Sequence, residues 1–95
     1  MSQYELALVL NPNLSDDDLN SQFDSIKNML EKSGASIEKI DNWGKKKLAY
    51  EIKKCNLGFY YFISFNSSAN VPIELEAKLR ITENVLRYLI IRKDV

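Results

Sequence analysis

The chain divides into segments whose apolar residues recur with the period of a β-strand or with that of an α-helix. Residues 4–10 form a mostly apolar run in which every second side chain falls on one face, as in a half-buried strand. After Asn-Pro-Asn at 11–13 the spacing becomes helical, from Ser15, which suits the N-terminal cap, to Gly34, which suits the C-terminal stop. The buried stripe predicted for this helix is Leu19, Phe23, Ile26 and Leu30.

The segment after Gly34 predicts a long, irregular strand that leads into a hairpin. The apolar positions of residues 35–52 change parity partway along, so we expect a bend or bulge near Gly44. The hairpin turn is expected to end at Gly58. The residues expected to anchor the strand after the bend are Leu48, Tyr50 and Ile52.

The remaining segments complete a recognisable order of elements. Residues 59–65 predict a strongly β-prone strand, Pro72 suits the first position of a short helix, and residues 85–92 predict a last strand. Strand, helix, strand, strand, helix, strand is the order of an α+β, ferredoxin-like split β-α-β sandwich with a four-stranded antiparallel sheet. We expect a single domain over residues 1–95, with both helices on one sheet face. The other face is left uncovered and must be solvated or bind a partner.

Composition removes several classes of function. The chain has no histidine and one cysteine, Cys55, which excludes an internal disulfide, a Cys/His zinc site and histidine-based acid–base catalysis. Catalytic and phosphate-binding sequence motifs are also missing. We therefore expect no enzyme, cofactor, metal or small-molecule substrate. The first residues lack the basic flank of a signal peptide, and no apolar run approaches the roughly 18 residues of a membrane span, so we expect a soluble intracellular protein without membrane contact.

Positive charge is concentrated in one segment, although the formal net charge of the chain is zero. Residues 43–54, WGKKKLAYEIKK, hold five lysines and one glutamate. These lysines fit either a solvated strand edge, where lysine blocks aggregation, or a contact with an anionic partner. Lys53 and Lys54, at the hairpin turn, stay undecided between the two. The candidate RNA-contacting cations of the chain are Lys45, Lys46, Lys47, Arg80, Arg87 and Arg92.

The uncovered sheet face is expected to carry aromatic side chains. The strand at 59–65 is central in this topology, so Tyr60 and Phe62 should stand on that face. Alternation allows Arg87 and Leu89 of the last strand, taken as its neighbour, to join them. Aromatic residues with flanking cations on an open sheet are the means by which RNA recognition motifs stack bases, although the signature of those motifs is absent here. A protein partner fits equally well, and its candidate contacts are Tyr60, Phe62 and Leu89.

Four blocks of the sequence resemble successive parts of the bacterial small-subunit ribosomal protein six family. They are YELALVLNPNLSDDDL, WGKKKLAYEIKK, LGFYYFISF and ELEAKLRITENVLRYLIIRKD, in family order over nearly the whole chain. The resemblance implies the same fold and a structural, non-catalytic role in the small ribosomal subunit. It implies two partners, small-subunit ribosomal protein eighteen as heterodimer partner and the central domain of small-subunit ribosomal RNA. The family's cations fall on Lys45, Lys46, Lys47, Arg80 and Arg87.

Two alternatives accompany this interpretation. In the first, the open sheet face pairs mainly with protein and contact with RNA is weak. In the second, which is remote, the fold carries an acylphosphatase-like hydrolase, but the acidic stretch at 10–18 would repel phosphate where such an enzyme needs a cradle. The leading interpretation implies a cytoplasmic, ribosome-associated protein.

Overall fold

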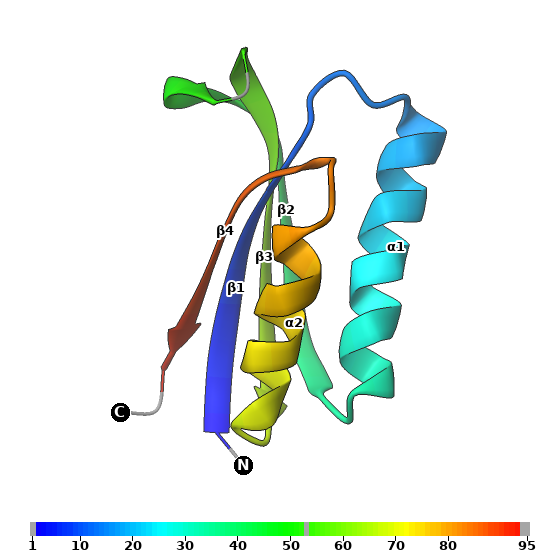
Figure 1. The fold of residues 1–95 in the computed structure, drawn as a ribbon, viewed down its shortest axis with the longest axis vertical. Helices are drawn as coiled ribbons and strands as arrows, with labels where there is room; N and C mark the ends of the chain where they lie inside the picture. The colour runs from blue at the N-terminus through cyan, green and yellow to red at the C-terminus, as the bar shows by residue number, and fades with distance from the viewer. Residues whose placement is uncertain (1, 53, 94–95) are drawn as a thin grey trace.

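Six elements follow one another in the predicted order (Figure 1). The computed structural model describes residues 2–52 and 54–93, so Lys53, expected at the hairpin turn, lies outside the described residues. The elements are β1 (Ser2–Leu10), α1 (Asp16–Lys32), β2 (Ser36–Ile52), β3 (Cys55–Ser67), α2 (Asn70–Arg80) and β4 (Val85–Arg92). In the described part of the chain neither helix is long and apolar enough to cross a membrane.

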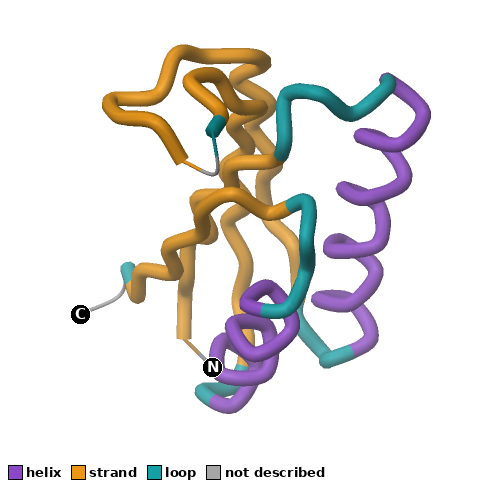
Figure 2. Tube along the Cα trace, turned by 45° about the horizontal axis from the view of Figure 1, so that its top comes forward, coloured by secondary structure: helices purple, strands orange, loops and turns teal. Residues whose placement is uncertain are grey.

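The strands form one antiparallel sheet in the order β2-β3-β1-β4, and both helices pack on the same face (Figures 1 and 2). The predicted ferredoxin-like architecture is confirmed, and β3 is an interior strand. The expectation that the last strand neighbours β3 is wrong, because β4 pairs with β1, which lies between them. Phe62 and Leu89 are therefore each paired with Ala7, and the small Ala7 side chain separates them.

The main core lies between the sheet and the two helices. The alternation predicted for residues 4–10 is confirmed, because every second side chain of β1 from Tyr4 onward is buried there. The helical stripe of α1 is also confirmed, with Phe23 only partly buried and stacked on Tyr61 at a ring-centroid distance of 4.5 Å. The largest fully buried side chains of this core are Leu6, Leu8, Leu10, Ile26, Leu30, Ile63, Phe65, Leu75 and Leu79.

The ends of α1 follow the predicted signals. The Ser15 hydroxyl oxygen accepts the backbone N–H of Asp18 at 3.2 Å, which satisfies a donor that the first turn leaves without a helical partner. The three aspartates at 16–18 lie in that first turn, where the helix dipole favours negative charge. Gly34 follows the helix with a φ of +92°, the left-handed conformation that glycine adopts at low cost.

Two predicted boundaries are wrong. The hairpin turn does not reach Gly58, because β3 already begins at Cys55. Gly58 lies inside the strand, where a Cβ would clash with Val9 Cγ1, so a close approach and not a turn requires glycine. Helix α2 begins at Asn70, two residues before Pro72. Pro72 is tolerated there because the N–H groups of a first helical turn have no carbonyl partner within the helix.

The predicted bend in the long strand β2 is confirmed at Gly44. The register of β2 against β3 shifts between Asn42 and Gly44, and Gly44 has a φ of +73°. The Asn42 side-chain oxygen accepts the Gly44 backbone N–H at 2.8 Å, which holds the bend. The shift leaves Trp43 without a cross-strand partner in the ladder and turns its ring onto Phe62, as described below.

Replacing Gly44 by alanine should lower the free energy of unfolding by about 1 kcal/mol, because an L-residue is strained at this φ. No atom lies within 4 Å of the added Cβ, so crowding contributes nothing. Urea unfolding measures the loss, and fluorescence of Trp43, the one tryptophan of the chain, reports the bend. Gly34→Ala is the matched control, since Gly34 also has positive φ and open space. It should lose similar stability without moving the Trp43 emission, and equal emission shifts in the two variants would contradict the assignment.

Candidate protein and nucleic-acid interface

The sheet face opposite the helices carries exposed apolar side chains at its centre. Trp43 of β2, Leu89 of β4 and Ile91 of β4 are 57%, 51% and 46% exposed. Phe62 of β3 is half-buried beneath Trp43, with the two ring centroids 4.7 Å apart. These four residues are called the open-face patch. Apolar side chains gathered in this way on a small protein are typical of an interaction surface.

A cavity of about 150 Å³ adjoins the patch and is lined by residues of three strands. It brings together four of the residues predicted to act on this face, Tyr60, Phe62, Arg87 and Leu89. Its other lining residues are Ala7, Val9 and Tyr88. Its size suits one or two apolar side chains of a partner more than an extended ligand.

The face is less open than predicted, because the end of β2 folds across it. This segment, residues 48–52, is called the hairpin arm, and Figures 1 and 2 show the far end of the β2–β3 hairpin turning over the sheet toward β4. Leu48 is only 6% exposed and packs with Val9 and Leu86 in a second, smaller core on this face. Leu48 is therefore an anchor, as predicted, but it is anchored to the open face and not to the main core.

Tyr50, the second predicted anchor, is not buried. Its hydroxyl oxygen accepts a hydrogen bond from Arg87 Nη1 at 3.2 Å, and the Arg87 guanidinium carbon lies 6.0 Å from the centre of its ring. The side chain is thus tied to β4 by polar contacts while most of it stays exposed. The same contacts hold the Arg87 side chain against the arm.

Lys45, Lys46 and Lys47 are exposed but do not share one face of the sheet. Lys45 Nζ lies 5.2 Å from the ring centre of Phe59, which packs against the main core on the helix side. Lys46 pairs with Gly58, and a Cβ on Gly58 would point toward Val9 on the open face, so Lys46 lies on the open face as well. Alternation returns Lys47 to the helix side. The three lysines therefore form a ridge along the β2 edge of the sheet.

The structure separates the other predicted cations from this ridge. Arg80 ends α2 on the helix layer, where its Nη2 lies 3.5 Å from Glu76 Oε1. The pKa of its guanidinium is raised, first by Tyr88, through a side-chain hydrogen bond and through charge, and then by Glu76. Arg92 pairs with Tyr4, a core position, and so lies on the helix side of the sheet. The predicted RNA contacts at Arg80 and Arg92 remain predictions, on a different face from Arg87.

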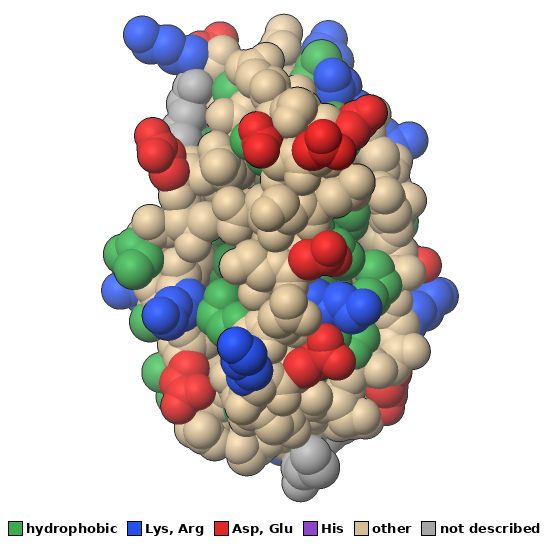
Figure 3. Space-filling model, turned by 90° about the vertical axis from the view of Figure 1, so that its right-hand side faces the viewer, with side chains coloured by type: hydrophobic (Ala, Val, Ile, Leu, Met, Phe, Trp, Pro, Cys, Tyr) green, Lys and Arg blue, Asp and Glu red, His purple; other side chains and the backbone are tan. Residues whose placement is uncertain are grey.

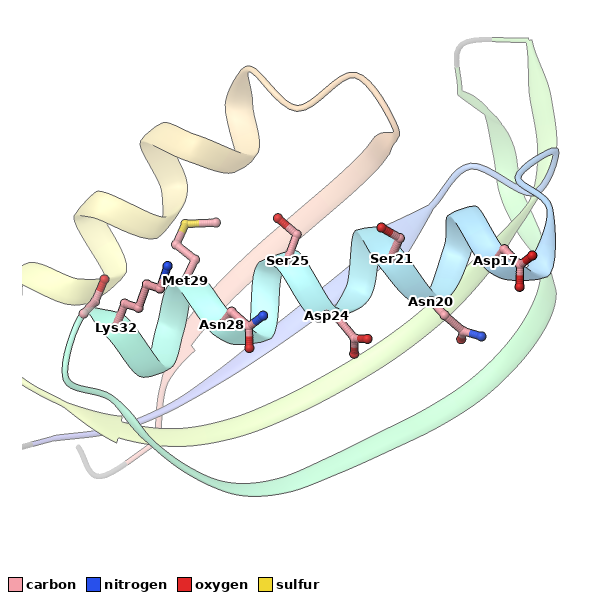
Figure 4. Close-up of a pocket in the computed structure, with 9 residues that line it drawn as sticks. Asp17, Asn20, Ser21, Asp24, Ser25, Asn28, Met29 and Lys32 are labelled. Carbon is pink, nitrogen blue, oxygen red and sulfur yellow. The ribbon is translucent and has the colours of Figure 1, made fainter.

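The helix layer shows no single-sign surface in the view of Figure 3, where acidic and basic side chains are interspersed. A shallow hollow there is lined by one helix alone, and Figure 4 shows its polar side chains projecting from α1. Its lining residues are Asp17, Asn20, Ser21, Asp24, Ser25, Asn28, Met29, Lys32 and Ser33. None of them is a predicted site residue. Within residues 2–52 and 54–93 no cluster of acidic or cysteine side chains is arranged to hold a metal ion.

Carboxylates occupy the open face beside the patch, toward the start of β1. Glu38 accepts hydrogen bonds from Gln3 Nε2 at 3.0 Å and from the Asn66 side-chain amide. Two further carboxylates are paired there, Asp41 with Lys39 at 3.6 Å and Glu5 with Lys93 at 3.7 Å. Lys39 and Lys93 offset the charges of Asp41 and Glu5, so this end of the face carries mixed charge and attracts phosphates little, which favours a protein over a nucleic-acid backbone.

Two residues that matter here were not among the predicted site residues. For Trp43 the signal in the sequence is its place directly before Gly44 in the predicted bend, where a residue can leave the regular ladder. Tyr50 was assigned to the strand's anchors. Nothing in the local sequence indicates that it would meet Arg87, 37 residues later.

Comparison with known proteins bears on the whole chain. A family model described as ribosomal protein S6 matches residues 3–92. Small ribosomal subunit protein bS6 of Caldanaerobacter subterraneus subsp. tengcongensis is 46% identical over 94 residues, 99% of each chain, and that of Clostridium kluyveri is 40% identical over 94 residues, again 99% of each. The crystal structure of 30S ribosomal protein S6 from Thermotoga maritima matches with a TM-score of 0.92 and 30% identity, covering 97% of this chain and 87% of that one. The chain therefore belongs to the ribosomal protein S6 family, a family of small-subunit ribosomal proteins.

Proposed function

We propose that this protein binds the central domain of small-subunit ribosomal RNA together with small-subunit ribosomal protein eighteen, in the cytoplasm. The observation that carries the proposal is the open-face patch, which lies exposed in a chain that belongs to a ribosomal protein family. An apolar surface of this kind is costly in water and is stabilised when a partner covers it. Within a ribosomal subunit that partner is protein or RNA.

The open-face patch is assigned to the protein partner. An aromatic pair with a neighbouring cavity is the typical centre of a protein–protein contact, where a few buried anchors supply most of the affinity. The carboxylates Glu5, Glu38 and Asp41 border the same face, two of them paired with lysines, so this border offers RNA phosphates little attraction. They suit a partner that carries lysine or arginine.

RNA is assigned to the lysine ridge at 45–47. The ridge lies along the exposed edge of β2, past Asp41 and past the bend at Gly44, and its side chains point to both sides of the sheet. Lysine contacts phosphates as a point charge, so this arrangement can follow a backbone without reading bases. Because the net charge of the chain is zero, the partner is expected to supply part of the attraction to RNA.

Replacing Lys45, Lys46 and Lys47 together by alanine should weaken binding of the heterodimer to a central-domain RNA fragment. The slope of log K against log salt should flatten by about 2 to 3, because each lost phosphate contact removes about 0.7–0.9 from it. Fluorescence anisotropy titrations at KCl concentrations from about 50 to about 300 mM measure this slope.

The matched control replaces Lys27, Lys32 and Lys78, which lie on the two helices, and removes the same charge. The control should leave the slope nearly unchanged. Equal slopes for both triple variants would overturn the assignment of the ridge. If ribosomal protein eighteen alone binds the RNA with the same salt slope as the heterodimer, the second candidate function is favoured, a protein-pairing adaptor with weak RNA contact. The separation of Arg80 and Arg92 from the ridge is the observation behind that candidate.

A further inference from the structure

The hairpin arm is not held in place by the sheet. The pairing of β2 with β3 breaks after Lys47 opposite Leu57 and resumes only at Ile52 opposite Cys55. Residues 48–51 therefore face a single residue of β3, and the arm leaves the plane of the sheet. Contacts outside the ladder must fix its position.

Two neighbouring contacts with β4 fix it. Leu48 packs on Leu86, and Tyr50, two residues on, accepts the hydrogen bond from Arg87. The register of β4 against β1 shifts at this point, since Leu10 pairs with Val85 and Val9 pairs with Arg87. The shift places Leu86 and Arg87 together on the open face, where each meets one arm residue.

Arg87 also lines the cavity beside the open-face patch. Its side chain thus lies between two surfaces, the cavity with Phe62 and Leu89 on one side and the arm with Tyr50 on the other. The lysine ridge at 45–47 runs directly into the arm along β2. A contact that fixes the arm therefore also limits the freedom of the ridge.

We propose that Tyr50 and Arg87 form a latch that holds the hairpin arm over the sheet, and that Arg87 is a positioning residue for the lysine ridge and not itself an RNA contact. The positioning role of Arg87 rests on the proposed RNA binding, whereas the latch itself does not. The latch orders the ridge before RNA arrives, so less conformational entropy is lost on binding. A partner side chain in the cavity would contact the stem of Arg87 and stabilise the same arrangement.

The deciding variant is Tyr50→Phe, which removes the hydroxyl acceptor without changing charge or ring. In the free protein, amide exchange, followed by NMR, in the two backbone pairs that flank the arm, Lys47 with Leu57 and Ile52 with Cys55, should accelerate about three- to tenfold, the size expected when one exposed hydrogen bond is lost. Arg87→Met, which keeps the stem but removes the guanidinium, should accelerate it at least as much. The double variant should exchange no faster than Arg87→Met. Tyr88→Phe, which removes a neighbouring hydroxyl on the helix side, is the control and should not change these rates.

The second measurement is RNA affinity of the complex with ribosomal protein eighteen. Tyr50→Phe should reduce it about two- to fivefold at an unchanged salt slope, because positioning and not charge is lost. Unchanged exchange of the flanking pairs in Tyr50→Phe would overturn the latch. Normal RNA affinity in Tyr50→Phe, combined with a salt slope lowered by about 0.7–0.9 in Arg87→Met, would assign Arg87 to phosphate contact and overturn the positioning role. If the wild-type complex binds no RNA, the proposed function fails, whereas the exchange rates still decide the latch.

Discussion

Replacing Trp43 and Phe62 together by alanine should weaken binding to ribosomal protein eighteen by about 2–4 kcal/mol, roughly 30- to 1000-fold in Kd. The two rings contact each other at 4.7 Å on the open face, so one ring supports the other and their single effects should not add. Isothermal titration calorimetry of the two single variants and the double variant with the purified partner measures the loss. We expect the double variant to stay folded, because both rings lie outside the main core.

The chain offers a matched control on its other side. Ile73 and Ile81 are 71% and 79% exposed, more than Trp43, but they belong to the helix layer. Replacing both by alanine removes a similar amount of exposed apolar surface and should leave the affinity for ribosomal protein eighteen unchanged. If the isoleucine variant loses as much affinity as the aromatic one, or if neither variant loses any, the partner does not bind the open-face patch.

Replacing Phe65 by alanine should lower the free energy of unfolding by about 3–5 kcal/mol, because the fully buried ring leaves a cavity in the main core. The ring also stacks on Tyr4 at a centroid distance of 5.6 Å, and that contact is lost as well. Guanidinium chloride unfolding, with the slope m compared between variant and wild type, measures the change.

Phe62→Ala provides the comparison, since it is the same substitution three positions earlier on the same strand. Phe62 is half-buried on the opposite face, so its loss should cost no more than about 1.5 kcal/mol of stability. Its binding to the partner should nevertheless fall. A loss of stability as large as that of Phe65→Ala would show that Phe62 belongs to the structural core and would remove it from the binding surface.

The parts of the fold that follow a regular period could be predicted from the sequence. Leu6, Leu8 and Leu10 alternate without interruption, and the stripe of α1 keeps helical spacing between a capping serine and a terminal glycine. These local patterns fix which side chains are buried because one face of each element must leave water. The family, one of small-subunit ribosomal proteins, was predicted from the four sequence blocks and is confirmed.

The candidate site could be predicted only in part, because it depends on breaks in those periods. Tyr60, Phe62, Arg87 and Leu89 share one cavity as alternation suggested. The positions of Trp43 and Tyr50 depend on register shifts in β2, and a shift changes the face of every residue that follows it. The contact of Tyr50 with Arg87 joins two strands that do not pair with each other, so no local pattern records it.

The irregularity of β2 has a consequence for the protein before it joins a ribosome. β2 is a 17-residue strand at the border of the sheet, and its outer backbone groups could template another strand and start aggregation. Three register shifts, at 37/39, 42/44 and 47/52, divide this border into short pieces that are not collinear. The lysines at 45–47 add charge between two of them, and charged edges resist strand pairing between molecules. The register shifts that place Trp43 and the hairpin arm over the sheet therefore also leave no long, straight edge on which a strand of a second molecule could pair.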